Sequence, residues 1–235
     1  MISSIQNVTT SSDRSIGSAW MEQRNHHGDG NKQIANFITA MFGEQSWMTK
    51  SDEKSFESFV YLSQIVQAVC TTSQAAFYRS RSGVNGTMGA LYWQLNDVWT
   101  TVSWSSIDYS KKYKPLHYEI SKVFTSPITL VTNHDVDDFL KVFVVSDADS
   151  VIWVELEIQS FLWNTLQMQD KAITPHIEVR PNGANLIQKS HVGFLLEELL
   201  CPFGQWDLCV FNLIIVREPS AMRFVKKFRL KVLSN

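Results

Sequence analysis

The stretch MGALYWQLNDVW, residues 88–99, is an apolar run that breaks into amide and carboxylate side chains between two tryptophans. With the preceding threonine, its apolar part predicts a β-strand over residues 87–95, buried on both faces as strands of parallel sheets are. The polar residues that follow predict either a simple turn, because Asn and Asp favour turns, or a functional site at the end of the strand. The place of this strand in a fold depends on the segments at either side.

Helical patterns lie before and after the predicted strand. Residues 56–80 carry apolar side chains at steps of three and four, which predicts one long amphipathic helix with Ser51 or Asp52 as its cap. A second helix is predicted over residues 114–124, where Pro115 suits the first turn. The order helix, buried strand, loop, helix is typical of the closing part of an α/β barrel, and it also fits one edge of an open sheet. The inner faces of the two helices are predicted to comprise Phe59, Leu62, Val66, Val69 and Phe77, and Leu116, Ile120 and Val123.

Beyond residue 125 the hydrophobic period changes from that of helices to that of strands. The segments are rich in β-branched and aromatic residues, and turn residues separate them. About seven such strands predict an antiparallel β-sandwich of immunoglobulin-like type, with a boundary near Pro127. Residues 192–200, VGFLLEELL, carry a short helical pattern. The clearest strand segments are FLKVFVVS at 139–146, VIWVELEIQS at 151–160, HIEVR at 176–180, LCVFNLIIV at 208–216 and RFVKKFRLKVL at 223–233.

The composition is that of a globular protein. Of the 235 residues 44% are hydrophobic and the formal net charge is −2. No electrostatic patch for nucleic acid or for an anionic membrane is therefore predicted, and small neutral partners are favoured. The chain contains 8 tryptophans and 14 phenylalanines, and the flat face of an indole suits the C–H face of a sugar. No cofactor is predicted.

The sequence predicts neither a signal peptide nor a transmembrane segment, since its amino terminus lacks a basic region before an apolar run and no window reaches about 18 apolar residues. The cysteines, Cys70, Cys201 and Cys209, have no metal-ligand spacing. Cys201 and Cys209 bracket a turn-like stretch, and the sequence leaves open whether they form a disulfide. It also leaves open whether Asn7 and Asn85, in the sequons NVT and NGT, are glycosylated.

Residues 87–124, TMGALYWQLNDVWTTVSWSSIDYSKKYKPLHYEISKVF, resemble the eighth barrel strand, its loop and the last barrel helix of β-mannosidases of glycoside hydrolase family 2. Residues 24–34, RNHHGDGNKQI, resemble the His-His-x-Gly-Gly-Asn-x-Gln stretch of the same enzymes, with Asp29 in place of a glycine. The resemblance implies a fold class of α/β plus all-β. Residues 1–125 would be the C-terminal part of a (β/α)8 TIM barrel, and residues 126–235 the immunoglobulin-like β-sandwich that follows it.

In that family the tryptophan at the end of the eighth strand forms the floor of the subsite for the mannose being cleaved, so the resemblance implies that Trp93 binds substrate. Stacking of a sugar on an indole contributes about 1–3 kcal/mol. Asn96 and Asp97 are candidates for sugar contact, for support of the site or for capping a turn. Trp104, like Trp99, is a candidate for the mouth of the cleft or for packing under the loop.

Two adjacent histidines belong to the second matching segment. Because neighbouring side chains point apart, His26 and His27 are not expected to hold one metal ion, and no metal site is predicted. One of the two histidines is predicted to hold its loop structurally.

The two catalytic carboxylates of a retaining glycosidase are expected to lie outside this chain. Such enzymes need two carboxyl groups about 5–5.5 Å apart. In the family the acid/base glutamate follows an asparagine, and the nucleophile lies in a Ser-Glu-aromatic-Gly stretch. The chain contains no Asn-Glu pair and no glutamate before an aromatic residue, so both glutamates are expected upstream of Met1.

The resemblance therefore implies a partial β-mannosidase that is inactive alone. Its family releases terminal β-D-mannose from glycans with retention and is lysosomal or secretory. The implied partners are a β-mannoside oligosaccharide and the rest of the enzyme. Two other hypotheses stay open: a non-catalytic glycan-binding or interaction module, and a complete enzyme of another kind that uses Asp97 with Glu22 or Asp108.

Overall fold

The computed structural model describes residues 1–24, 26–83, 86–124, 128–201, 209–218 and 222–229. The sequon residue Asn85 and the predicted boundary residue Pro127 lie outside the described residues. The chain divides into two compact units. One comprises Met1–Ala75 with Leu91–Thr125, and the other Ala76–Ala90 with Ser126–Asn235.

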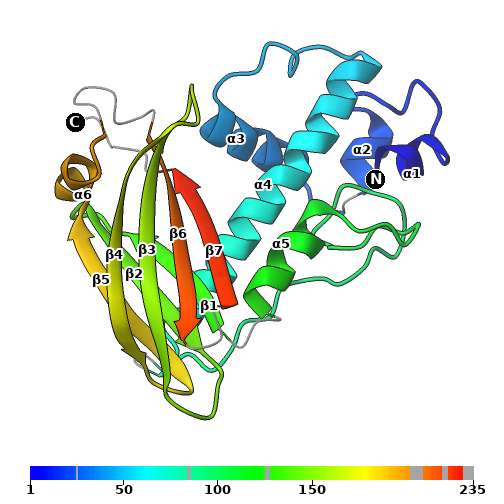
Figure 1. Ribbon diagram of the computed structural model, residues 1–235. Helices are drawn as coiled ribbons and strands as arrows, with labels where there is room; N and C mark the ends of the chain where they lie inside the picture. Colours follow the sequence, from blue (N-terminus) through cyan, green and yellow to red (C-terminus); the bar gives the residue numbers. More distant parts are fainter. Residues whose placement is uncertain (25, 84–85, 125–127, 202–208, 219–221, 230–235) are drawn as a thin grey trace. The chain divides into compact units, whose positions relative to one another are not determined.

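Five helices precede the strands (Figure 1). The predicted long helix is confirmed as α4, and the predicted helix after Lys114 is confirmed as α5. No described helix is both long and apolar enough to cross a membrane. The helices are α1 (Ile2–Gln6), α2 (Ala19–Arg24), α3 (Gly30–Phe42), α4 (Glu53–Arg79) and α5 (Pro115–Phe124).

The helix α4 begins at the predicted cap. Asp52 accepts hydrogen bonds from the backbone N–H of Ser55 at 2.9 Å and from its hydroxyl at 3.0 Å. These bonds satisfy a donor that the first turn leaves unpaired. The backbone hydrogen bond from Ser55 also lowers the pKa of the Asp52 carboxyl.

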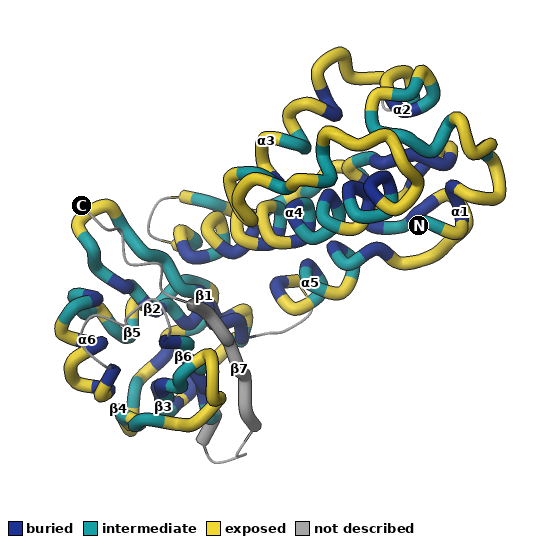
Figure 2. Tube along the Cα trace, turned by 90° about the horizontal axis from the view of Figure 1, so that it is seen from above, coloured by how far each residue is buried: buried dark blue, intermediate teal, exposed yellow. Residues whose placement is uncertain are grey.

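The inner face of α4 is predicted correctly in its first half and wrongly in its second. Buried and exposed residues alternate along α4 (Figure 2), and Phe59 and Val66 belong to the core of the helical unit. Val69 and Phe77 are 46% and 39% exposed, contrary to the prediction. The apolar cluster that covers α4, built with residues of α1, α2 and α3, extends along it only to Val66. The predicted inner face of α5 is confirmed, because Leu116, Ile120 and Val123 are buried.

The predicted strand over residues 87–95 is wrong. Within it only Thr87 makes a bridge, to Ser82, and Met88 and Leu91 are 95% and 103% exposed. A parallel strand exists only when neighbouring strands supply its hydrogen bonds. In the described part of the chain every sheet strand comes after residue 127, so the apolar pattern has no strand to pair with.

The predicted antiparallel strands are confirmed in the second unit. They form a three-stranded sheet of order β1-β2-β5 and a four-stranded sheet of order β4-β3-β6-β7 (Figure 1). The register of β2 against β5 shifts at Val142/Phe143, where the ladder carries a bulge. The strands are β1 (Ile128–His134), β2 (Phe139–Ser146), β3 (Ile152–Leu162), β4 (Met168–Val179), β5 (Gly183–His191), β6 (Cys209–Glu218) and β7 (Met222–Arg229).

The core of this unit lies between the two sheets. Alternate residues of β3, such as Val154 and Leu156, are fully buried there, in one apolar cluster with residues of β6 in the same sheet and of β2 in the other sheet. The short helix expected near residues 192–200 is present as α6 (Val192–Glu198), and His191 caps it by accepting the Gly193 N–H at 3.2 Å. The described residues therefore form a mixed fold of helices and antiparallel sheet.

A disulfide joins Cys201 to Cys209, with their Cα atoms 6.3 Å apart. It links the segment after α6 to the start of β6, and both residues belong to the buried core of the sandwich. The bridge resolves the alternative that the sequence leaves open. Cys70, in the other unit, is an exposed free thiol, and partial desolvation by its neighbours raises its pKa.

Candidate functional site

The tryptophan-rich loop, residues 94–113, follows Trp93 and folds back on itself. The backbone N–H of Asp97 donates to the carbonyl of Ile107 at 2.9 Å, and the N–H of Ile107 donates to the carbonyl of Leu95 at 2.9 Å. At the far end, the N–H of Lys114 donates to the carbonyl of Ser106 at 2.9 Å. The start of the loop and the start of α5 are thus held side by side.

A buried polar network fills the inside of this loop. The ammonium of Lys114 lies 2.9 Å from Oδ2 of Asp97, and both side chains are only 1% exposed. Lys114 also donates to the hydroxyl of Ser105 at 2.8 Å and to that of Ser103 at 3.3 Å. The hydroxyl of Ser103 in turn donates to the second oxygen of Asp97. Every member therefore has a partner, as a buried charged network requires.

The electrostatics of the network are those of a neutralised pair. Burial lowers the pKa of Lys114, because a charge is costly to remove from water, and the adjacent Asp97 carboxylate opposes that shift. Neither group is left to act as a free acid or base.

The carboxylates proposed for a different complete enzyme are likewise engaged. Asp108 accepts from the hydroxyl of Ser4 at 2.7 Å and from the N–H of Lys112 at 2.9 Å. Burial pushes the pKa of Asp108 upward, but these hydrogen bonds, together with the Met1 ammonium at 3.5 Å, outweigh it and leave the pKa below its ordinary value. Glu22 accepts from the amide of Asn31 at 3.2 Å. A carboxyl group that acts as a general acid near neutral pH needs a raised pKa, and that of Asp108 is lowered, so this arrangement does not favour that hypothesis.

The remaining predicted site residues near the start of the loop are accessible. Trp93 is 74% exposed, and the peptide bond that joins it to Gln94 is cis. Asn96 is also exposed, and its amide donates to the carbonyl of Asp97 at 3.2 Å. The preceding Tyr92 is anchored, since its hydroxyl lies 2.9 Å from that of Ser106.

The two histidines contact different indoles, as expected from their adjacency. The ring centroid of His26 lies 5.1 Å from that of Trp99, and that of His27 lies 6.0 Å from that of Trp104. Trp99 also donates from Nε1 to the carbonyl of Arg24 at 2.9 Å. The His-His segment is therefore attached to the tryptophan-rich loop through two aromatic contacts.

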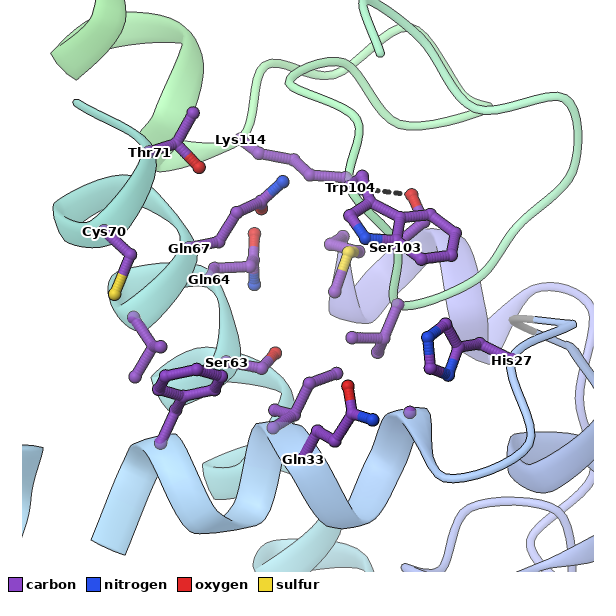
Figure 3. Close-up of a pocket in the computed structure, with 16 residues that line it drawn as sticks. His27, Gln33, Ser63, Gln64, Gln67, Cys70, Thr71, Ser103, Trp104 and Lys114 are labelled. Atoms are coloured by element: carbon purple, nitrogen blue, oxygen red, sulfur yellow. Dashed lines mark hydrogen bonds between the residues drawn. The ribbon is translucent and has the colours of Figure 1, made fainter. Parts of the chain in front are cut away.

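A cavity of about 280 Å³ lies beside this loop, within the helical unit (Figure 3). Side chains of α3 and α4 form two of its walls, and His27, Trp104 and Lys114 are at the loop side. Of the four predicted substrate-binding residues only Trp104, which is 48% exposed, lines this cavity. Trp93, Asn96 and Asp97 do not.

The sequence alone does not indicate the contacts of three residues that are important to this region. Lys114 is the first residue of the predicted helix 114–124 and immediately precedes the observed α5, and nothing local in the sequence indicates its partner. Asn31 is buried and donates to the carbonyl of Met21 at 3.0 Å, which satisfies the end of α2. Arg24 places its guanidinium 5.6 Å from the ring centroid of Trp99 and donates to the carbonyl of Thr100 at 3.2 Å. The only sequence signal for Arg24 and Asn31 is the Arg-x-His-His-x-x-x-Asn spacing itself.

Comparison with known proteins confirms the resemblance found in the sequence. The chain is 33% identical to the β-mannosidase of Rattus norvegicus over 215 residues, which cover 89% of this chain and 24% of that protein. It is 30% identical to the β-mannosidase of Capra hircus over 239 residues, covering 99% of this chain and 26% of that protein. The chain thus spans about a quarter of the length of these relatives. No protein-family model matches it.

Solved structures agree on the fold. The β-D-mannosidase of Dictyoglomus thermophilum superposes with a TM-score of 0.75 at 22% identity, over 97% of this chain and 26% of that one. The exo-chitosanase of Amycolatopsis orientalis superposes with a TM-score of 0.59 at 16% identity, over 86% of this chain and 22% of that one. At these identities the likeness concerns the fold alone.

Proposed function

We propose that this chain, related in sequence to about a quarter of a β-mannosidase, supplies the closing part of the catalytic barrel and the following sandwich to such an enzyme. Residues 1–125 would contribute the last segment of a (β/α)8 barrel of glycoside hydrolase family 2. Residues 126–235 would be its immunoglobulin-like domain. The observation that carries the proposal is the match to the β-mannosidase of Capra hircus, which covers 99% of the chain.

The strand order supports the immunoglobulin-like assignment. In a constant-type immunoglobulin domain the first, second, fifth and fourth strands form one sheet and the third, sixth and seventh the other. Here β1-β2-β5 and β3-β6-β7 follow that order, and only β4 differs, because it pairs with β3. Related sandwiches share this architecture without an identical topology.

The tryptophan-rich loop supports a role in substrate binding. Trp93 offers an exposed indole on which a mannose ring of a β-mannoside oligosaccharide would stack, with Asn96 beside it. Asp97 would act indirectly, because its carboxylate is buried against Lys114 and is turned away from solvent. Trp104 would line the neighbouring surface.

Two catalytic glutamates would come from the rest of the enzyme, since no glutamate here has the sequence context of either one. The complete protein would release terminal β-mannose with retention, in a lysosomal or secretory compartment. The disulfide between Cys201 and Cys209 supports an oxidising compartment. The chain alone would not turn over substrate.

A chimera tests this proposal. Residues 1–235 replace the matching quarter of the rat β-mannosidase, and an aryl β-mannoside is the substrate. We expect hydrolysis by the chimera and none above the buffer blank by the isolated chain. A folded chimera without activity would contradict the proposal. Turnover by the isolated chain would instead favour a complete enzyme that uses carboxylates within these residues.

A further inference from the structure

We propose that the cavity between α3, α4 and the tryptophan-rich loop binds a neutral polyhydroxylated ligand the size of a monosaccharide. This place is separate from the platform suggested for Trp93, which does not line the cavity. In Figure 3 the side chains of Gln33, Ser63, Gln64 and Gln67 lie on the helical side, and Trp104 lies on the loop side. The inference stands on the chemistry of these walls and goes beyond the proposed reaction.

The polar groups of α4 leave oxygen atoms available to a ligand. The hydroxyl of Ser63 and the amide nitrogen of Gln64 both donate to the carbonyl of Val60, at 2.8 Å and 3.1 Å. The amide nitrogen of Gln67 donates to the carbonyl of Ser105 at 3.1 Å. These bonds fix the side chains and engage the hydroxyl hydrogen of Ser63 and one N–H of each amide, and the side-chain oxygens remain as acceptors. A ligand rich in hydroxyl groups supplies the donors that such oxygens require.

The other surfaces of the cavity are apolar. Trp104 presents its indole, and Ile34, Phe37 and Val66 add aliphatic and aromatic surface. A pyranose has a ring face of C–H groups as well as a rim of hydroxyls, and it can meet an aromatic wall and a polar wall together. A purely apolar ligand would supply no hydrogen-bond donor to the amide oxygens.

The charge and the volume of the cavity restrict the class of ligand further. Lys114 is the only Lys, Arg, Asp or Glu among the described lining residues, and Asp97 at 2.9 Å neutralises it. The terminal ammonium of Met1, which also lines the cavity, is paired with the Asp108 carboxylate at 3.5 Å. An anion therefore gains no free cation here. The cavity of about 280 Å³ lies at the lower end of the range for ligand sites. It suits one sugar ring and excludes a long oligosaccharide.

The test is a titration of the 235-residue chain with D-mannose, followed by saturation-transfer NMR, with sodium phosphate as an anionic probe. We expect saturable binding of mannose and none of phosphate. Trp104→Ala should weaken mannose binding at least about fivefold. Trp153→Ala is the matched control, because Trp153 is 46% exposed in the other unit while Trp104 is 48% exposed. Circular dichroism of each variant verifies its fold.

Gln64→Leu is the second variant, since it keeps the side-chain volume and removes the acceptor; we expect it to weaken binding at least about threefold. If Trp104→Ala does not fold, Gln64→Leu provides the test of the proposal. Trp153→Ala should leave the affinity unchanged. Mannose binding that is unchanged in both Trp104→Ala and Gln64→Leu would overturn the proposal, as would a folded chain that binds no mannose or prefers phosphate. An inactive chimera would contradict the proposed function and leave this result standing.

Discussion

Lys114 and Asp97 form an ion pair at 2.9 Å in which both side chains are 1% exposed. Asp97 lies shortly after Trp93, and Lys114 immediately precedes α5. The pair therefore ties the beginning of the tryptophan-rich loop to the helix that follows it. Because Ser103 and Ser105 join the same network, the middle of the loop is held as well.

Removal of one partner should be costly. Lys114→Met leaves the Asp97 carboxylate buried without its cation, and breaking a buried pair in this way typically costs about 3–5 kcal/mol. We expect a loss of that size in the free energy of unfolding, measured by urea titration with tryptophan fluorescence. Lys122→Met is the control, because Lys122 pairs with Glu119 at the surface, where a pair contributes at most about 1 kcal/mol. Equal effects of the two substitutions would contradict the role of the buried pair.

The disulfide should stabilise the sandwich. Replacement of both Cys201 and Cys209 by Ser opens a short loop, and the chain-entropy relation predicts a loss of about 2–3 kcal/mol for a loop of this length. The same titration, with circular dichroism of the strands as the signal, measures the loss. Cys70→Ser should change stability little, since Cys70 is an exposed free thiol of the other unit. An unchanged unfolding midpoint in the double variant would show that the bridge contributes nothing.

Asp108 should make stability depend on acid pH. Its pKa in the folded chain lies below its ordinary value, so the unfolded chain takes up the proton first as the pH falls. The resulting stabilisation is complete above the unfolded pKa of about 3.9 and is lost as the pH falls through the folded pKa. Asp108→Asn should lower stability at pH 7 by about 1–2 kcal/mol and flatten its decline below about pH 4.

A matched carboxylate provides the control for this pH dependence. Asp29 is exposed and makes no capping hydrogen bond at the start of α3. Asp29→Asn should therefore leave the loss of stability at acid pH unchanged. Unfolding curves at several pH values between about 2 and 7 span the relevant window. If Asp108→Asn and the unmodified chain lose stability in parallel over that window, the assigned role of Asp108 is wrong.

Features determined by nearby residues could be predicted from the sequence. The apolar spacing and the Asp52 cap predict α4, Pro115 predicts the start of α5, and the strand pattern of residues 139–146 matches β2 residue for residue. Each of these elements draws its hydrogen bonds or its amphipathic pattern from its own segment or from an antiparallel neighbour inside the chain.

Features that depend on distant partners could not be predicted. The apolar run at residues 87–95 has the composition of a buried strand, yet strand formation requires neighbouring strands, which the described residues do not provide. The pairing of Lys114 with Asp97 has no fixed spacing that a pattern could reveal. The aromatic contacts of His26 and His27 follow from the same folding of the loop.

The role proposed for Trp93 leads to a prediction about the activity of the chimera. In the full-length chimera, Trp93→Ala removes the indole on which the sugar would stack, and stacking contributes about 1–3 kcal/mol. We expect kcat/KM for an aryl β-mannoside to fall by at least about tenfold, because about 1.4 kcal/mol corresponds to one factor of ten. Since Trp93 is 74% exposed in this chain, its removal should cost little stability.

A tryptophan of the other unit serves as the control that distinguishes loss of the stacking surface from general damage to the protein. Trp163 is 59% exposed and lies next to β3 in the sandwich, so Trp163→Ala should leave both kcat/KM and the thermal midpoint unchanged. The two variants are compared at a temperature well below the midpoint of each, where unfolding does not contribute to the rates. If Trp93→Ala retained kcat/KM within about threefold, equivalent to about 0.65 kcal/mol of transition-state stabilisation, the platform role would be wrong. A large fall in the thermal midpoint with intact low-temperature activity would instead assign Trp93 to packing within the complete barrel.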